Sequence, residues 1–310
     1  ASSGQVAVMF IVLMALWLRV AQLSQPSFHI DEYLHVLSAQ QLAHGNEARL
    51  PSGNVYTRAL PYTRMVAASF RLFGVSEASA RLPSVIFGVL LVVATYLVGR
   101  RWFGPWEGVV AAALVAVSPT LVVASRLCRM YSLFHLLYLG TVFAYERGWE
   151  APESRLRARL WWSGLGLVLL LTSERLHPLT LVGLVPALVV YWIARTLLRW
   201  RSRYSLWLLV AVTLGVIGLA TGAITIAQVW QKLTYVPIWA EKNRFHESLY
   251  LKQWAASFPW MWWVALAAML HVCARYRARG FLVVCLFAVP FLLHSLVLPW
   301  KAPRYVSHLF

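Results

Sequence analysis

The sequence predicts an all-α, polytopic membrane protein with about nine transmembrane helices, and three observations predict it. Hydrophobic residues make up 60% of the 310 residues and charged residues only 13%. Soluble domains are roughly one half apolar and one quarter charged, so the composition excludes an ordinary soluble domain. Long apolar runs recur along the whole chain, and arginines cluster in the short segments between them.

Each predicted span lies on an apolar run long enough to cross a hydrocarbon core of about 30 Å, which takes about 20 helical residues. The first run could be a signal peptide. It has no basic segment before it and no clear cleavage site of small residues, so we expect a true helix. The predicted spans cover residues 6–23, 82–99, 107–124, 130–146, 161–175, 178–197, 205–227, 256–274 and 280–299.

Orientation follows from the short connectors, which hold 13 arginines. The positive-inside rule places these connectors in the cytoplasm. The long segments 24–81 and 228–255 then form two outer loops within a single membrane domain, residues 1–310. The connectors are 99–102, 147–159, 195–203 and 275–279.

The first outer loop is predicted to contain two amphipathic helices that lie on the membrane. Residues 29–44 and 60–73 each place apolar side chains near one stripe of a helix. Gly45 and Gly74 are suited to end these helices.

The net charge of +17 indicates an anionic partner. An anionic bilayer surface or a phosphorylated ligand fits this charge, whereas the apolar composition argues against nucleic acid. The three scattered cysteines form neither a disulfide framework nor a zinc motif, so we expect them in the core.

An acidic pair opens the first outer loop. Asp31 is the only aspartate of the chain, and Glu32 follows it directly. Adjacent side chains on a helix diverge by about 100°, so one carboxylate could act as a general base while the other orients it or is solvated. The alternative is a helix N-terminus whose acids only complement the helix dipole.

Two Glu-x-x-His pairs, Glu32 with His35 and Glu174 with His177, could each share a helix face. Such pairs occur in di-iron bundles together with two further glutamates, which no span supplies here. Coincidence is therefore the preferred interpretation, and a single divalent cation at Glu32 and His35 is the alternative. Glu174 and Arg175 could also simply pair with each other. The sequence thus supports no definite cofactor.

Two groups of basic and aromatic residues lie on the same predicted outer side as Asp31. Cations near a membrane suggest function, and the arginine fork suits a phosphate, although snorkelling and interfacial anchoring are the alternatives. The first group is Arg126, Arg129 and Tyr131, and the second is Lys301, Arg304, Tyr305 and His308.

Four stretches in order resemble the lipid-dependent glycosyltransferases of the GT-C class, in the bacterial branch related to protein O-mannosyltransferases and aminoarabinose transferases. They are HIDEYLH, the run LFGVSEASARLPSVIFGVLLVVATYLVGRRWFG from Leu72 to Gly104, SPTLVVASRLCRMYSL from Ser118 to Leu133, and WKAPRYVSHLF at the end.

The resemblance implies transfer of a sugar from a polyprenyl-phosphate donor to an acceptor hydroxyl on the outer face of a bacterial inner membrane, normally with inversion. It implies Asp31 as the catalytic base with Glu32 beside it. Donor phosphate binding would fall to Arg129, Tyr131, Arg304 and Tyr305, and His177 with Glu174 close by matches a family position. Lys301 is a further phosphate candidate because a preorganised cation stabilises the leaving group, and Arg58 and Arg126 are further candidates for substrate binding.

Two departures from the family pattern keep a second interpretation open. Some members carry a further acid in the second outer loop, where this chain has only Arg126 and Arg129. Members are also commonly longer, so the sequence represents a fragment, a minimal version or a chain that continues past Phe310. The alternative is a non-catalytic GT-C-like subunit of a larger membrane complex. A transporter is disfavoured, because no paired broken spans occur.

Overall fold

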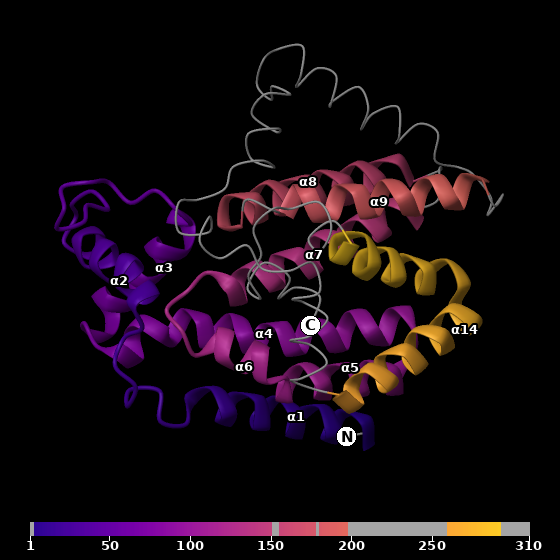
Figure 1. Ribbon diagram of the computed structural model, residues 1–310, viewed down its shortest axis with the longest axis horizontal. Helices are drawn as coiled ribbons and strands as arrows, with labels where there is room; N and C mark the ends of the chain where they lie inside the picture. Colours follow the sequence, from indigo (N-terminus) through magenta and orange to yellow (C-terminus); the bar gives the residue numbers. More distant parts are fainter. Residues whose placement is uncertain (1–2, 151–154, 178–179, 198–258, 293–310) are drawn as a thin grey trace, which may run out of the picture. The chain divides into compact units, whose positions relative to one another are not determined.

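The computed structural model describes residues 3–150, 155–177, 180–197 and 259–292, and these residues form ten helices (Figure 1). The described residues contain no β-strand, only one isolated bridge between Arg49 and Val55. The chain divides into two compact units, Ala1–Thr180 and Leu181–Leu309. The first unit holds α1 (Ser3–Val20), α2 (Ile30–Ala43), α3 (Leu60–Phe73), α4 (Glu77–Trp102), α5 (Pro105–Val117), α6 (Pro119–Ser125), α7 (Tyr131–Glu150) and α8 (Leu156–Leu176). The second holds α9 (Thr180–Leu197) and α14 (Pro259–Leu292).

Helix α4 is the centre of the first unit, where it packs against α1, α3, α5, α6 and α7, and α7 packs in turn along α8. A buried apolar cluster joins α1, α4 and α5. A Cβ added at Gly108 would lie only 2.6 Å from the Arg100 backbone nitrogen, which shows that the backbones of α4 and α5 are in close contact. The cluster comprises Ile11, Ala15, Val92, Ala112 and Ala116.

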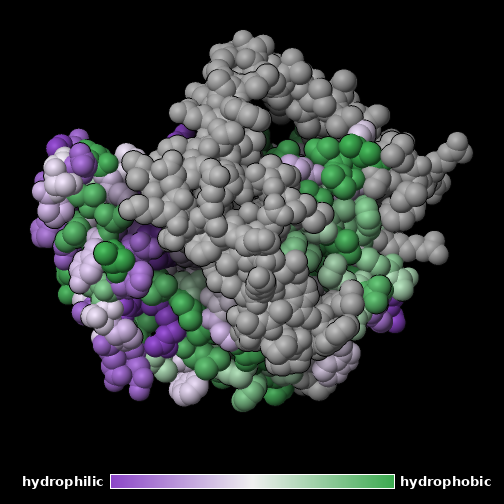
Figure 2. Space-filling model, in the orientation of Figure 1, coloured by the Kyte–Doolittle hydropathy of each residue, from purple (hydrophilic) through white to green (hydrophobic). Residues whose placement is uncertain are grey.

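Helices α2 and α3 occupy the positions of the two helices expected in the first outer loop. Gly74 adopts a positive φ of 75° at the end of α3, as its predicted role as a terminator requires. A hydrogen bond joins α3 to α4 where the hydrogen-bond ladder of α4 is interrupted. Pro83 has no N–H to donate to the Ser79 carbonyl, so the Ser69 hydroxyl on α3 donates to that carbonyl instead, at 2.7 Å. Hydrophilic side chains gather where α2 and α3 lie (Figure 2).

The predicted span 107–124 is not one straight helix. It is broken at Ser118 into α5 and α6, whose axes differ by 62°. The break arises because Pro119 excludes the helical conformation at the residue before it, and Ser118 accordingly has a ψ of 116°. The bend turns α6 back beside α4 and positions the following turn, residues 126–130, near α2.

Long arginine side chains close the helix ends in this region. Arg126 donates to the Leu18 and Ala21 carbonyls at the end of α1, at 2.9 and 2.7 Å. Buried Arg19 donates to the Ala116 carbonyl at the end of α5 at 3.0 Å. These bonds satisfy carbonyls that have no partner within their own helix.

Nine spans remain a sequence prediction. Within the described residues, α4 alone is long and apolar enough to cross a membrane, and the bent pair α5 and α6 makes a second candidate if counted as one span. The described parts of two predicted spans, 259–274 and 280–292, lie in α14, which bends sharply between them (Figure 1). A Cβ at Gly280 would lie 2.5 Å from the Val272 carbonyl oxygen, whereas a straight helix would separate residues eight positions apart by about 12 Å. The predicted span 205–227 and outer loop 228–255 lie outside the described residues.

Candidate active site

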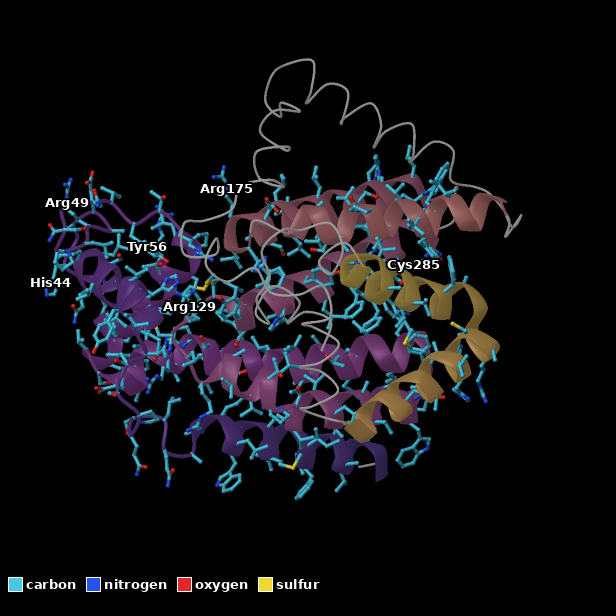
Figure 3. The ribbon with its side chains drawn as sticks, viewed as in Figure 1. His44, Arg49, Tyr56, Arg129, Arg175 and Cys285 are labelled. Atoms are coloured by element: carbon cyan, nitrogen blue, oxygen red, sulfur yellow. The ribbon has the colours of Figure 1, made fainter. Side chains whose placement is uncertain are left out.

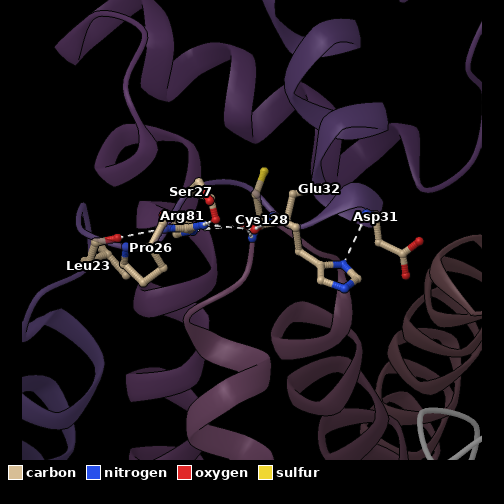
Figure 4. Close-up of polar contacts among 8 residues, drawn as sticks. Leu23, Pro26, Ser27, Asp31, Glu32, Arg81 and Cys128 are labelled. Carbon is tan, nitrogen blue, oxygen red and sulfur yellow. Dashed lines mark hydrogen bonds and ion pairs between the residues drawn. The ribbon is translucent and has the colours of Figure 1, made fainter.

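A buried ion pair between Glu32 on α2 and Arg81 on α4 connects several segments of the first unit (Figure 4). The Arg81 Nε donates to Glu32 Oε1 at 3.0 Å, and its Nη2 donates to Oε2 at 2.9 Å. Glu32 is fully buried and Arg81 is 2% exposed. Because the two side chains bind as parallel forks, the pair fixes the angle between α2 and α4 as well as their separation.

Both members of the pair also hold backbone groups in place. Glu32 accepts the backbone N–H of Cys128 at 2.6 Å and that of His29 at 2.8 Å. The remaining N–H groups of Arg81 bind the carbonyls of the connector between α1 and α2, which belong to Leu23, Pro26 and Ser27.

The Glu32 carboxylate is therefore ionised and structural. Burial alone would raise its pKa, but hydrogen bonds from Arg81, Cys128 and His29 hold the pKa of Glu32 below its usual value. Through these hydrogen bonds the ion pair holds three segments together: the α1–α2 connector, the start of α2 and the α6–α7 turn. In this position both Glu32 oxygens are bound within the protein, and Glu32 holds the segment that carries Asp31.

Asp31 faces the other way. Figure 4 shows its carboxylate pointing away from Arg81. The side chain is 42% exposed, and its Oδ2 lies 3.8 Å from Nη2 of Arg129. Arg129 also donates through Nη1 to the Asp31 backbone carbonyl at 2.7 Å. The only aspartate of the chain thus lies at an accessible position beside a buried cation.

The Arg129 guanidinium contacts Tyr131 as well as Asp31. Its guanidinium lies over the Tyr131 ring, 5.5 Å from the centroid, and its Nη2 is 3.4 Å from the Tyr131 hydroxyl. The side chain is 4% exposed, yet its Nε has no hydrogen-bond partner in the part of the chain that the structure describes. An unsatisfied buried donor on a cation is costly and is suited to bind an anionic ligand.

A buried histidine and its partners line the same corner. His35 donates from Nδ1 to Thr63 Oγ1 at 2.9 Å, because the Thr63 hydroxyl itself donates to the Ala59 carbonyl. Its Nε2 then accepts from the Tyr56 hydroxyl at 3.5 Å. Burial, together with repulsion from Arg129 and Arg58, lowers the pKa of His35 to about 3, so the ring is neutral at pH 7.

Arg58 is exposed and follows Tyr56 by two residues, and its charge contributes to the lowered pKa of His35. Figure 3 shows Tyr56 and Arg129 at the same end of the first unit. The corner therefore combines one exposed carboxylate with two cations.

The alternative of a divalent cation at Glu32 and His35 does not fit their contacts. Glu32 is bound by Arg81, whereas both ring nitrogens of His35 face Thr63 and Tyr56. The residues that the structure describes contain no group of three or more metal-ligating side chains.

Of the other predicted site residues, those that the structure describes lie outside α2, which carries Asp31. Arg126 caps α1 and contacts different elements from Arg129. His177 is 2% exposed and stacks on Phe134, at a centroid distance of 4.9 Å, one helical turn from Tyr131. Glu174 is half-buried on the last turn of α8. Lys301, Arg304, Tyr305 and His308 lie outside the described residues.

Arg81 and Tyr56 were not predicted as site residues. Arg81 directly precedes the apolar run 82–99, and a lone arginine at the edge of such a run is a functional signal that could have identified it. Tyr56 carried no such signal, because a tyrosine in a polar loop is common.

The comparison with known proteins decides the family. A family model described as dolichyl-phosphate-mannose-protein mannosyltransferase matches residues 61–224, which is more than half of the chain. The chain belongs to this family. The predicted GT-C class, in the branch related to protein O-mannosyltransferases and aminoarabinose transferases, is thereby confirmed, and the family is one of membrane glycosyltransferases.

Two solved structures share the fold of this family member. The crystal structure of ArnT from Cupriavidus metallidurans in the apo state has a TM-score of 0.74 and 16% identity, with 99% of this chain and 58% of that chain covered. The crystal structure of ArnT from the same organism bound to undecaprenyl phosphate has a TM-score of 0.72 and 18% identity, with 100% and 58% covered. The chain thus spans less than two thirds of the length of the structures that it matches. No curated protein matches the sequence.

Proposed function

We propose that the protein transfers a sugar from a polyprenyl-phosphate donor to an acceptor hydroxyl at the outer face of a bacterial inner membrane. Membership in the mannosyltransferase family supports the reaction class. The likeness to an ArnT that binds undecaprenyl phosphate supports the class of donor. The observation that carries the proposal is the accessible Asp31 carboxylate beside Arg129.

Asp31 is the base in this proposal. A carboxylate that accepts the proton of the acceptor hydroxyl in the transition state typically contributes about a hundredfold to ten-thousandfold to the rate. The 42% exposure of Asp31 allows an acceptor to reach it, and its backbone is held by Arg129. Glu32 acts only through the fold, as a positioning residue.

Arg129 binds the departing phosphate. As the acceptor oxygen bonds to the anomeric carbon, the bond from that carbon to the donor phosphate oxygen breaks, and the electron pair leaves with the phosphate. The unpartnered Nε of Arg129 and the nearby charge of Arg58 are suited to stabilise this developing charge. We propose Lys301, Arg304 and Tyr305 as further phosphate contacts.

Direct displacement inverts the anomeric centre. The sequence of bond changes requires the acceptor and the phosphate on opposite faces of the sugar, with Asp31 on the acceptor side. The acceptor hydroxyl gives its proton to Asp31, so the charges balance without a covalent intermediate on the enzyme.

The test is the substitution Asp31→Asn in the full chain, assayed with undecaprenyl-phosphate-linked mannose and aminoarabinose as donors in liposomes made from total bacterial membrane lipid and protein, whose hydroxyl groups serve as acceptors. We expect sugar transfer to fall by about a hundredfold or more, with unchanged thermal unfolding. Glu47→Gln is the matched control, because Glu47 is an exposed acid of the same loop, paired with Arg49, and its removal should leave transfer unchanged.

Equal transfer rates in the wild type and the Asp31→Asn variant would refute the role of Asp31. A wild-type protein that binds undecaprenyl phosphate but transfers neither sugar would favour the alternative of a non-catalytic subunit in a larger complex.

A further inference from the structure

A cavity of about 570 Å³ lies beside the connector between α1 and α2. The α6–α7 turn closes it on the other side, and Arg81 and Glu32 form part of its wall. The apolar part of its lining is formed by Leu23, Pro26, Phe28, Ile30, Val123 and Leu127. Ile30 and Val123 are 77% and 56% exposed, so the cavity opens to the surroundings.

Most polar groups of the wall are already satisfied within the protein. All five N–H groups of Arg81 are taken up by Glu32 and the connector carbonyls. The two Glu32 oxygens accept four donors, two from Arg81 and one each from Cys128 and His29. The only acid in the wall is therefore neutralised, and neither residue of the pair is available to a ligand.

The polar groups that remain can all donate hydrogen bonds. Arg126 uses only Nη1 on the α1 carbonyls, and its Nε and Nη2 bind no other described residue. His29 accepts the Asp31 N–H through Nδ1, so its proton lies on Nε2. Ser27 adds a hydroxyl to the same wall.

A positive, donor-rich end and apolar walls together select an anionic amphiphile. A free anion would gain nothing from the apolar walls, and a neutral lipid would leave the Arg126 charge without a partner. The volume lies within the usual range for small-molecule sites, about 300 to 1,000 Å³. It accommodates a head group and the first part of its chain.

We propose that this cavity binds the phosphate head group of an anionic membrane lipid, with Arg126 as the phosphate ligand. The site differs from the proposed donor site, because Arg126 contacts α1 whereas Arg129 contacts Asp31. The lipid chain lies against Phe28 and Ile30, which are three residues and one residue before Asp31. A bound lipid therefore orders the segment that carries the proposed base. Binding itself does not depend on the proposed transfer reaction.

The experiment measures lipid retention by native mass spectrometry after the full chain is reconstituted in phosphatidylcholine vesicles. Separate arms add phosphatidylglycerol, undecaprenyl phosphate or inorganic phosphate. Arg126→Gln removes the proposed ligand, and Val123→Glu places an acid in the wall without touching the bonds that cap α1. Each should weaken binding of the phosphate lipid about tenfold or more.

Arg71→Gln is the matched control. Arg71 caps α2 through Ala43 and Leu42 as Arg126 caps α1, but it does not line the cavity. Retention should be unchanged in this variant.

The three arms identify the source of the phosphate. Retention of phosphatidylglycerol that depends on Arg126 assigns the site to a bulk phospholipid, and the same result with undecaprenyl phosphate alone assigns it to the polyprenyl lipid. Retention of both lipids that is unchanged by Val123→Glu would overturn the proposal. So would equal retention of phosphatidylcholine, or binding of inorganic phosphate with the affinity of the lipids.

Discussion

Breaking the buried Glu32–Arg81 pair should cost the fold far more than breaking an exposed pair of similar length. In Arg81→Met the carboxylate keeps only the N–H groups of Cys128 and His29, and an uncompensated buried charge remains. Breaking a buried pair in this way costs about 3 to 5 kcal/mol. The exposed pair of Glu47 and Arg49, at 2.8 Å and with side chains 67% and 56% exposed, should contribute about 1 kcal/mol or less.

Cys128 offers a direct assay of this difference. Its thiol is fully buried and its backbone N–H is bound to Glu32, so a reagent reaches it only when the α6–α7 turn opens. Burial raises the pKa of Cys128 to about 12, which keeps the thiol unreactive in the closed state. A loss of about 3 to 5 kcal/mol corresponds to labelling roughly a hundredfold to several thousandfold faster.

The assay is alkylation of Cys128 in the full chain, in a Cys273→Ser and Cys285→Ser background. Glu32→Gln and Arg81→Met should each accelerate labelling, and the double variant should be less destabilised than the sum of the two by about 1 to 3 kcal/mol. Equal labelling rates in Arg81→Met and in the Glu47→Gln control would refute the reasoning, because burial would then not decide the contribution of an ion pair.

Two further predictions concern the same unit. His35 has a pKa lowered to about 3, so the unfolded chain binds its proton first and stability should fall as pH drops from 6.5. His35 should contribute about 1.5 to 2 kcal/mol to the loss between pH 6.5 and pH 5, and His35→Phe should reduce the slope of SDS unfolding titrations by that amount; buried His135 and His177 keep their contributions, and a slope unchanged by the substitution would refute the role of His35. Gly88→Ala should destabilise the protein by about 1 to 3 kcal/mol, because the added Cβ would lie 2.6 Å from the Ser125 Cβ. Thermal unfolding of the detergent-purified variant measures this. Adding Ser125→Gly should recover only part of the loss, because the added Cβ also lies 2.9 Å from the buried Arg19 Nε, which donates to the Ser125 hydroxyl. An unchanged midpoint in Gly88→Ala would show that α4 and α6 are not packed at this point.

Helix positions in the first unit could be predicted from local sequence, because each helix follows an apolar run or an amphipathic stripe. Thus α4 covers the predicted span 82–99, and α2 and α3 match the two helices expected in the first loop. The break at Ser118 was missed, although Pro119 gave the signal, because hydropathy alone does not register a proline inside an apolar run. The arginines of the connector 275–279 predicted a turn, and α14 bends sharply there, because Gly280 lies against the Val272 backbone.

The candidate site was likewise predictable only in part from the sequence. The sequence by itself determined that the protein has one aspartate, that a second acid adjoins it, and that arginines occupy the α6–α7 turn. Only the tertiary structure decided that Glu32 faces Arg81 and Asp31 faces Arg129. The physical reason is that adjacent helix residues point about 100° apart, so only the packing of α4 and of the α6–α7 turn against α2 determines which carboxylate is buried. The partner of Glu32 lies 49 positions away in the chain, beyond the reach of any local pattern.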